Sequence, residues 1–181
     1  MVYLVFWVFL PSLKAERAGN FEIAITPTSK ESSQRTGGDG YWTEKEKSQK
    51  LTYRVTITCK GLEKLEDLQV KYIVVYSAPG TYYHRDGNNN NRDGMRVING
   101  DEKIAKFVPL DSTEFTTKEV QNTYQENTWE GGRSSWGKAQ LKGIALKIMQ
   151  GDKVLAELAK PANMKDYWKR VEESAPGQGR K

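Results

Sequence analysis

The stretch that decides the fold is residues 51–59, which read LTYRVTITC. Apolar side chains such as Leu51, Val55 and Cys59 occupy every second position, and threonine, arginine or lysine follows each of them. Neighbouring side chains of a strand point to opposite faces, so this pattern predicts a strand with one buried and one solvent-exposed face. Cys59, the single cysteine of the chain, lies on the apolar side. We therefore expect an inert buried thiol and no internal disulfide.

Further strand patterns lie on both sides of this stretch. Residues 70–76 (VKYIVVY) are apolar on both faces after their lysine, which predicts a central, well-covered strand. Residues 21–26 alternate in the same way as residues 51–59 and predict an earlier strand. Residues 104–110 and 113–121 predict two more strands from weaker patterns.

A hairpin is predicted near the end of the chain. Residues 142–149 and 153–158 flank Gln150-Gly151-Asp152, where glycine suits a tight turn. Residues 162–173 form the one good helical pattern, with Pro161 just before it. Seven strands and one helix predict an all-β, antiparallel β-sandwich with a short C-terminal helix. Five strand residues are expected to share one core with Cys59: Val55, Ile57, Val74, Leu146 and Ile148.

The C-terminal part of the chain also resembles a known kind of protein. Trp136-Gly137, then LKGIALKI at 141–148, GDKVLAE at 151–157 and Pro161-Ala162 resemble the last strand pair of small exported immunoglobulin-like proteins of bacterial envelopes. The resemblance covers about a quarter of the chain. It implies an immunoglobulin-like sandwich and an envelope location, but no activity. The likeness is architectural, because the paired cysteines of antibody domains are missing.

The N-terminus carries an unbroken apolar run, VYLVFWVFL at residues 2–10, followed by Pro11 and Ser12. Nine residues are too few for a membrane-spanning helix, which needs about 20. The run is typical of a secretory signal, although no basic residue precedes it. We expect cleavage near Ala15 and a location in the periplasm, at the cell surface or in the medium. A buried first strand is the alternative interpretation.

These patterns divide the chain into a signal-like segment at 1–15, one domain at 16–173 and a flexible tail at 174–181. The formal charge is +5, and the charged residues are interleaved without a long basic run. This disfavours nucleic-acid binding, and contact with a membrane is expected only through the signal-like segment. His84 is the single histidine, and a Gly-x-Ser-x-Gly motif is absent. We therefore expect a protein that is not an enzyme and needs no cofactor.

Three polar stretches, residues 28–50, 80–99 and 122–138, are predicted to be long loops. Several aromatic residues lie in them, including Tyr41-Trp42 and Tyr124. Flat rings in polar loops can stack on sugars or anchor a protein partner, whereas the alternative is that they plug the sandwich ends. Four of these rings are the candidate ligand-binding residues: Tyr82, Tyr83, Trp129 and Trp136.

Residues 86–94 also suggest a weaker calcium alternative. Their oxygen donors have the alternate spacing of a calcium loop, and the candidates are Asp86, Asn88, Asn90 and Asp93. However, Asn91 and Val97 stand where such a loop needs glycine and glutamate, and neighbouring arginines oppose a cation. An asparagine-rich turn without a metal is favoured.

Together these features predict an exported envelope or surface protein that is not an enzyme. Its expected role is structural or adhesive, through protein–protein binding. The alternative is a carbohydrate-binding module that uses the loop aromatics. A sugar binder should present exposed rings together on one face. A protein binder should present a free strand edge or a contiguous apolar patch.

Overall fold

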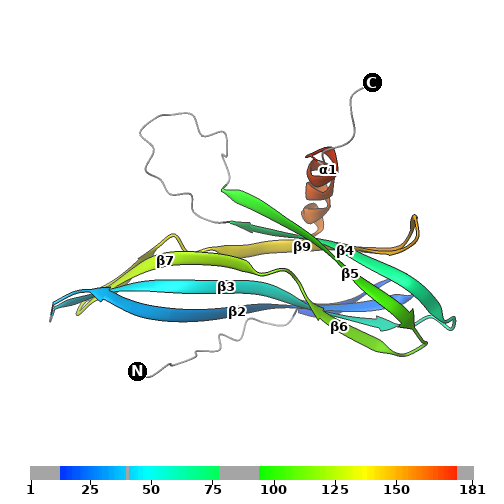
Figure 1. Ribbon diagram of the computed structural model, residues 1–181, viewed down its shortest axis with the longest axis horizontal. Coiled ribbons are helices and arrows are strands. Elements are labelled where there is room, and N and C mark those ends of the chain that lie inside the picture. The colour runs from blue at the N-terminus through cyan, green and yellow to red at the C-terminus, as the bar shows by residue number, and fades with distance from the viewer. Residues whose placement is uncertain (1–12, 40, 78–93, 175–181) are drawn as a thin grey trace.

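The computed structural model describes residues 13–39, 41–77 and 94–174. In these residues the chain forms two antiparallel sheets and a short C-terminal helix (Figure 1). The long sheet has the strand order β1 (Leu13–Ala18), β2 (Phe21–Gly37), β3 (Trp42–Cys59), β7 (Val120–Trp129) and β8 (Gly132–Trp136). A further short strand, β6 (Ser112–Thr116), pairs with the C-terminal half of β3.

The short sheet has the order β10 (Lys153–Lys160), β9 (Gln140–Gln150), β4 (Leu65–Ser77) and β5 (Met95–Phe107). The predicted hairpin is confirmed, because β9 and β10 pair directly around Gly151, which has the positive φ of 57° that favours glycine.

One apolar core lies between the two sheets, as the sequence predicts. Val55 and Ile57 of β3 are fully buried against Val74 of β4 and Leu146 and Ile148 of β9. Cys59 belongs to the same cluster and is completely buried. Burial of these side chains supplies the main driving force for folding a chain that has no disulfide.

The C-terminal helix covers the other face of the short sheet. A 3-10 turn (Ala162–Met164) leads into α1 (Lys165–Ser174), and Figure 1 shows α1 standing on the side of β4 and β9 that points away from β2 and β3. Met164 and Trp168 pack there against Ile73 and Val75. This second cluster explains why the sequence of β4 is apolar on both faces.

Two of the predicted loops are strands. Residues 28–50 form most of the β2–β3 hairpin, and residues 122–138 form most of the β7–β8 hairpin. Their strands are polar on both faces, so they lack the apolar alternation that marks a strand in the sequence. Residues 104–107 of the strand predicted at 104–110 form the end of β5, and residues 108–110 lie in the turn that follows. The strand predicted at 113–121 covers most of β6 and the start of β7.

Candidate functional site

The long sheet extends beyond the apolar core as an arm. We define the arm as residues 30–37, 42–50, 121–129 and 132–136, and Figure 1 shows its strands running to the left end of the molecule. The last inward apolar pair is Leu51 and Val120, which are register partners and buried. The next inward pair is Gln49 and Asn122, so the inner face turns polar at this point.

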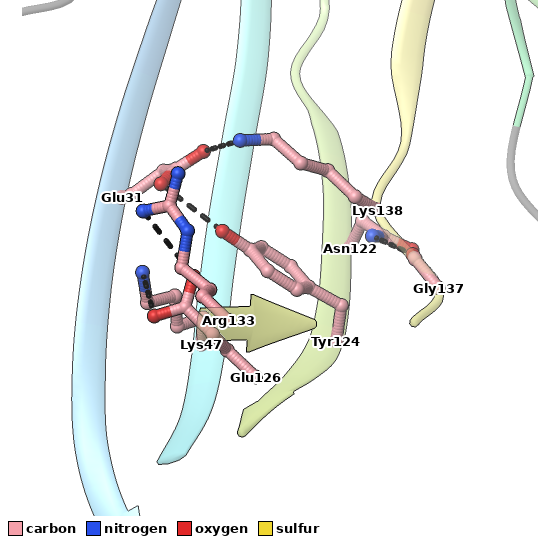
Figure 2. A network of polar contacts seen from close by, with 8 residues as sticks. All are labelled: Glu31, Lys47, Asn122, Tyr124, Glu126, Arg133, Gly137 and Lys138. Carbon is pink, nitrogen blue, oxygen red and sulfur yellow. Dashed lines mark hydrogen bonds and ion pairs between the residues drawn. The ribbon is translucent and has the colours of Figure 1, made fainter. Parts of the chain in front are cut away.

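Glu31 and Tyr124 form the first polar group on the inner face of the arm (Figure 2). The Tyr124 hydroxyl donates a hydrogen bond to Glu31 Oε2 over 3.1 Å. Lys138 Nζ pairs with Glu31 Oε1 at 2.8 Å and lies 5.5 Å from the centre of the Tyr124 ring. These contacts connect β2 to β7 and to the segment that follows β8.

Glu126 forms the second polar group, beside the first (Figure 2). It pairs with Lys47 at 2.8 Å and, more loosely, with Arg133 at 3.9 Å. The Asn122 side chain donates to the Gly137 carbonyl over 2.7 Å. The side chains of Lys47 and Glu126 are only 17% and 8% exposed, so the pair is largely withdrawn from water. Such a pair holds β3, β7 and β8 in one arrangement.

The pKa values on the inner face follow from these contacts. Burial acts to raise the pKa of Glu31, but its hydrogen bonds with Lys138 and Tyr124 and the charges of Lys138 and Lys47 outweigh burial and hold it below the ordinary 4.5. Burial, followed by the negative charge of Glu31, raises the pKa of the Tyr124 phenol well above 10. At neutral pH a charged acceptor therefore faces a neutral donor. The network is suited to fixing the shape of the arm rather than to acid–base catalysis.

The turn at the end of the arm is fixed by local hydrogen bonds. Asp39 Oδ1 accepts from the backbone N–H of Tyr41 at 2.9 Å and of Trp42 at 3.3 Å. The Arg35 side chain donates to the carbonyls of Gly37 and Gly38, each at 3.3 Å. Gly38 has a φ of 113°, and a Cβ there would collide with the Trp42 carbonyl, so this position requires glycine.

Three exposed aromatic side chains surround this turn, and we call them the tip. Tyr41 is 83% exposed, Trp42 40% and Trp129 46%. Trp42 and Trp129 are register partners on β3 and β7, so both lie on one face of the sheet. Leu51 is nine residues beyond Trp42 on the same strand and points into the core, which places the two tryptophans on the outer face.

The indole of Trp129 lies over the glycine turn that joins β7 to β8. A Cβ added at Gly132 would lie 3.3 Å from Cζ2 and 3.5 Å from Cε2 of this ring, and one at Gly131 would lie 3.5 Å from Nε1. The turn therefore supports one side of the indole. Trp129 is nevertheless 46% exposed.

The structure places the predicted site residues in different environments. Trp129 is exposed at the tip, whereas the neighbouring loop candidate Tyr124 is 3% exposed and belongs to the inner network. Trp136 ends β8, with its backbone opposite Gln125, and its side chain lies outside what the structure describes. The remaining ring and calcium candidates also lie outside the described residues: Tyr82, Tyr83, Asp86, Asn88, Asn90 and Asp93.

Tyr41 and Trp42 are exposed at the tip but are not among the four candidate rings predicted from the sequence. A sequence signal was available, because both follow the glycine-rich turn at 37–40, just as Trp129 precedes Gly131-Gly132. A large aromatic residue beside a hairpin turn sits at the end of its strands, beyond the reach of the core. In the described residues, no group of three or more histidine, cysteine or acidic side chains is arranged to hold a metal ion. No helix of this part is both long and apolar enough to cross a bilayer.

Comparison with known proteins adds little to this picture. No protein-family model matches the sequence, and no curated protein matches it. A crystal structure from Akkermansia muciniphila is similar over 86% of this chain and 80% of its own, at 12% identity and a TM-score of 0.31. An X-ray structure of a Northeast Structural Genomics Consortium target is similar over 75% of this chain and 84% of its own, at 12% identity and a TM-score of 0.23. Similarities this low carry no argument about function.

Proposed function

We propose that this chain is an exported envelope or surface protein, not an enzyme, that acts by binding, as a structural or adhesion component. Its recognition site is the tip. The observation that carries the proposal is the pair Trp42 and Trp129, two large aromatic residues that are register partners on neighbouring strands and are 40% and 46% exposed. Exposed tryptophans are favoured as anchors of binding sites because they contribute large contact areas with few rotatable bonds.

The inner network supports this proposal from the other face of the same strands. Lys47 and Glu126 pair on the inner face of the arm, and Glu31 joins Tyr124 and Lys138 there. A rigid arm loses little conformational freedom when its tip binds a partner, and this preorganisation improves affinity. The carboxylates of the network are engaged with cations, which is an arrangement that stabilises rather than reacts.

The edge of the short sheet is a less suitable binding surface. Among the described strands β5 pairs with β4 alone, so its other edge has no hydrogen-bonded strand beside it. Charged residues are spread along β5, including Arg96, Asp101, Glu102 and Lys103. Charges on an edge strand oppose the addition of a further strand. The tip is therefore preferred over the β5 edge.

The immunoglobulin-like assignment and the exported location are parts of the same proposal. The β9–β10 hairpin, Pro161 and the following helix have the order that the C-terminal resemblance implies. Cleavage near Ala15 would shorten β1 but keep Glu16, whose side chain pairs with Lys160 at 3.1 Å. N-terminal sequencing of the native protein tests export, and a mature chain that still starts at Met1 contradicts it.

The binding role is tested with the double variant Trp42→Ala/Trp129→Ala and labelled protein added to an envelope fraction of the native host. We expect saturable binding by the parent and a loss of at least about 10-fold in the variant, the size typical of an anchor residue. Val154→Ala is the matched control, because Val154 is 47% exposed but lies on β10, away from the tip. Equal binding by the parent and the folded double variant would contradict the proposal.

A further inference from the structure

The outer face of the arm carries ordered rows of polar side chains next to the two tryptophans. On β3 the next two positions of this face are Glu44 and Glu46, and their register partners on β7 are Asn127 and Gln125. Three rows therefore follow one another along the sheet: two rings, then two rows that each pair a carboxylate with a carboxamide. Same-face positions on a strand are about 7 Å apart.

This face has no aliphatic side chain. The other outward positions of β2, β3, β7 and β8 in the arm carry polar residues or glycine, such as Ser48, Thr123 and Ser134. The exception is Trp136, whose backbone lies opposite Gln125 and whose side chain is outside what the structure describes. The centre of a protein–protein interface is depleted of charge and rich in apolar contacts. The residues next to the two tryptophans are instead polar or charged and can form hydrogen bonds with a ligand.

The indole of Trp129 lies against the Gly131-Gly132 turn. The face of an aromatic ring carries negative charge density, and it attracts weakly positive C–H groups. A pyranose ring presents such C–H groups on its face and hydroxyls around its rim.

The negative charge of the outer face favours an uncharged ligand over an anionic one. Glu44 and Glu46 lie next to Trp42 on the same side of β3, so the rows beside the rings carry negative charge. Carboxylates accept hydrogen bonds from hydroxyl groups and repel sulfates, phosphates and sialic acids. This complementarity favours an uncharged ligand that is rich in hydroxyls.

Building on the proposed function, we infer that the outer face of the arm binds a neutral glycan. One sugar ring stacks on the exposed indole of Trp129, beside Trp42. The next part of the glycan lies along the two carboxylate–carboxamide rows, where the exposed Glu46 and Gln125 receive its hydroxyl groups. Residue Gly132 is a positioning residue, since a larger side chain there would press against the indole.

The experiment uses the purified chain on a glycan array that carries neutral, sialylated and sulfated oligosaccharides, followed by calorimetric titration with the best neutral ligand. We expect selective binding of neutral glycans. Trp129→Ala should weaken binding at least about 10-fold, Trp129→Phe should weaken it less, and Gly132→Val should weaken it although the indole is retained. Val154→Ala should bind as the parent does. Thermal melts confirm that each variant is folded.

Different results of these experiments test the neutral-glycan inference and the proposed binding function separately. Binding of neutral glycans that depends on Trp129 and Gly132 supports the inference. Recognition through the tip of anionic glycans only, or of an envelope protein without any glycan, overturns the neutral-glycan inference and leaves the binding role standing. Envelope binding that is unchanged in the Trp42→Ala/Trp129→Ala variant overturns both.

Discussion

Tyr124 and Trp129 lie on the same strand, five residues apart, and face opposite sides of it. Tyr124 is 3% exposed on the inner face of the arm, and Trp129 is 46% exposed on the outer face. One ring is therefore part of the scaffold and the other is free to contact a ligand. The two residues form a matched pair for separating stability from recognition.

Alanine variants of this pair should differ in stability. Tyr124→Ala removes a buried ring and the hydrogen bond to Glu31, so we expect a loss of about 3–5 kcal/mol. Trp129→Ala should cost about 1 kcal/mol or less, because much of its ring is in solvent. Thermal and denaturant unfolding measure both. If Trp129→Ala unfolds as easily as Tyr124→Ala, the tip is structural and its role in binding is wrong.

The buried ion pair of the arm should also be essential for stability. Glu126→Ala leaves Lys47 charged and largely buried without its partner, and we expect a loss of about 3 kcal/mol. Glu114→Ala is the control, since Glu114 pairs with Arg54 across an exposed surface where both side chains are more than half exposed. Its removal should cost less than about 1 kcal/mol. Equal losses in urea unfolding would mean that the Lys47–Glu126 pair is not withdrawn from water.

Stability should fall in acid because of Glu31. Its pKa in the folded chain is below the ordinary 4.5, so the charged carboxylate stabilises the fold above that value. The contribution is lost as the pH falls through the folded-state pKa and Glu31 becomes protonated. Glu31→Gln should therefore be less stable than the parent at pH 7, with a smaller difference near pH 3. Unfolding free energies measured across this range check the prediction, and parallel curves would contradict it.

The core should protect the single thiol. Cys59 is completely buried between the sheets, so a thiol reagent should label it only after denaturant is added. Val74→Ala removes two methyl groups from the same core and should cost about 1–3 kcal/mol. Mass spectrometry follows the labelling. Rapid reaction of the native protein would show that the face of β3 that carries Cys59 opens to solvent.

Gln49 offers a substitution that should not destabilise the chain. Its side chain is 2% exposed, and its Oε1 is buried without a hydrogen-bond partner in the described residues. An unpaired buried acceptor costs about 1–3 kcal/mol. Gln49→Met keeps a similar volume without that oxygen, so we expect equal or greater stability in denaturant titrations. A clear loss would show that the Gln49 amide is held by contacts in solution.

The sequence was sufficient to predict the core but not the arm. Residues 51–59 alternate because one of their faces is buried under the short sheet, and that burial leaves a period of two in the sequence. The same strand continues through residues 42–50 without the signal, since its inner face there contacts ion pairs instead of apolar side chains. Hydropathy cannot distinguish such a strand from a loop.

The candidate site shows the same limit. Trp129 was identified from its polar surroundings, but Tyr124 has similar surroundings and is buried. The difference between them is parity along β7, which is fixed by the turn to β8 and by pairing with β3. Trp42 and Trp129 are register partners although they are far apart in the sequence. Only the register of the sheet reveals this pairing.

The continuity of β3 has a mechanical consequence. This one strand of 18 residues runs from the tip into the core, with β2 along one side and β7 followed by β6 along the other. Sheet hydrogen bonds lie perpendicular to the strands, so tension applied to a ligand at the tip loads many of them in shear at once. They must fail together rather than one after another. A protein built in this way can resist a load applied at the tip without a covalent crosslink.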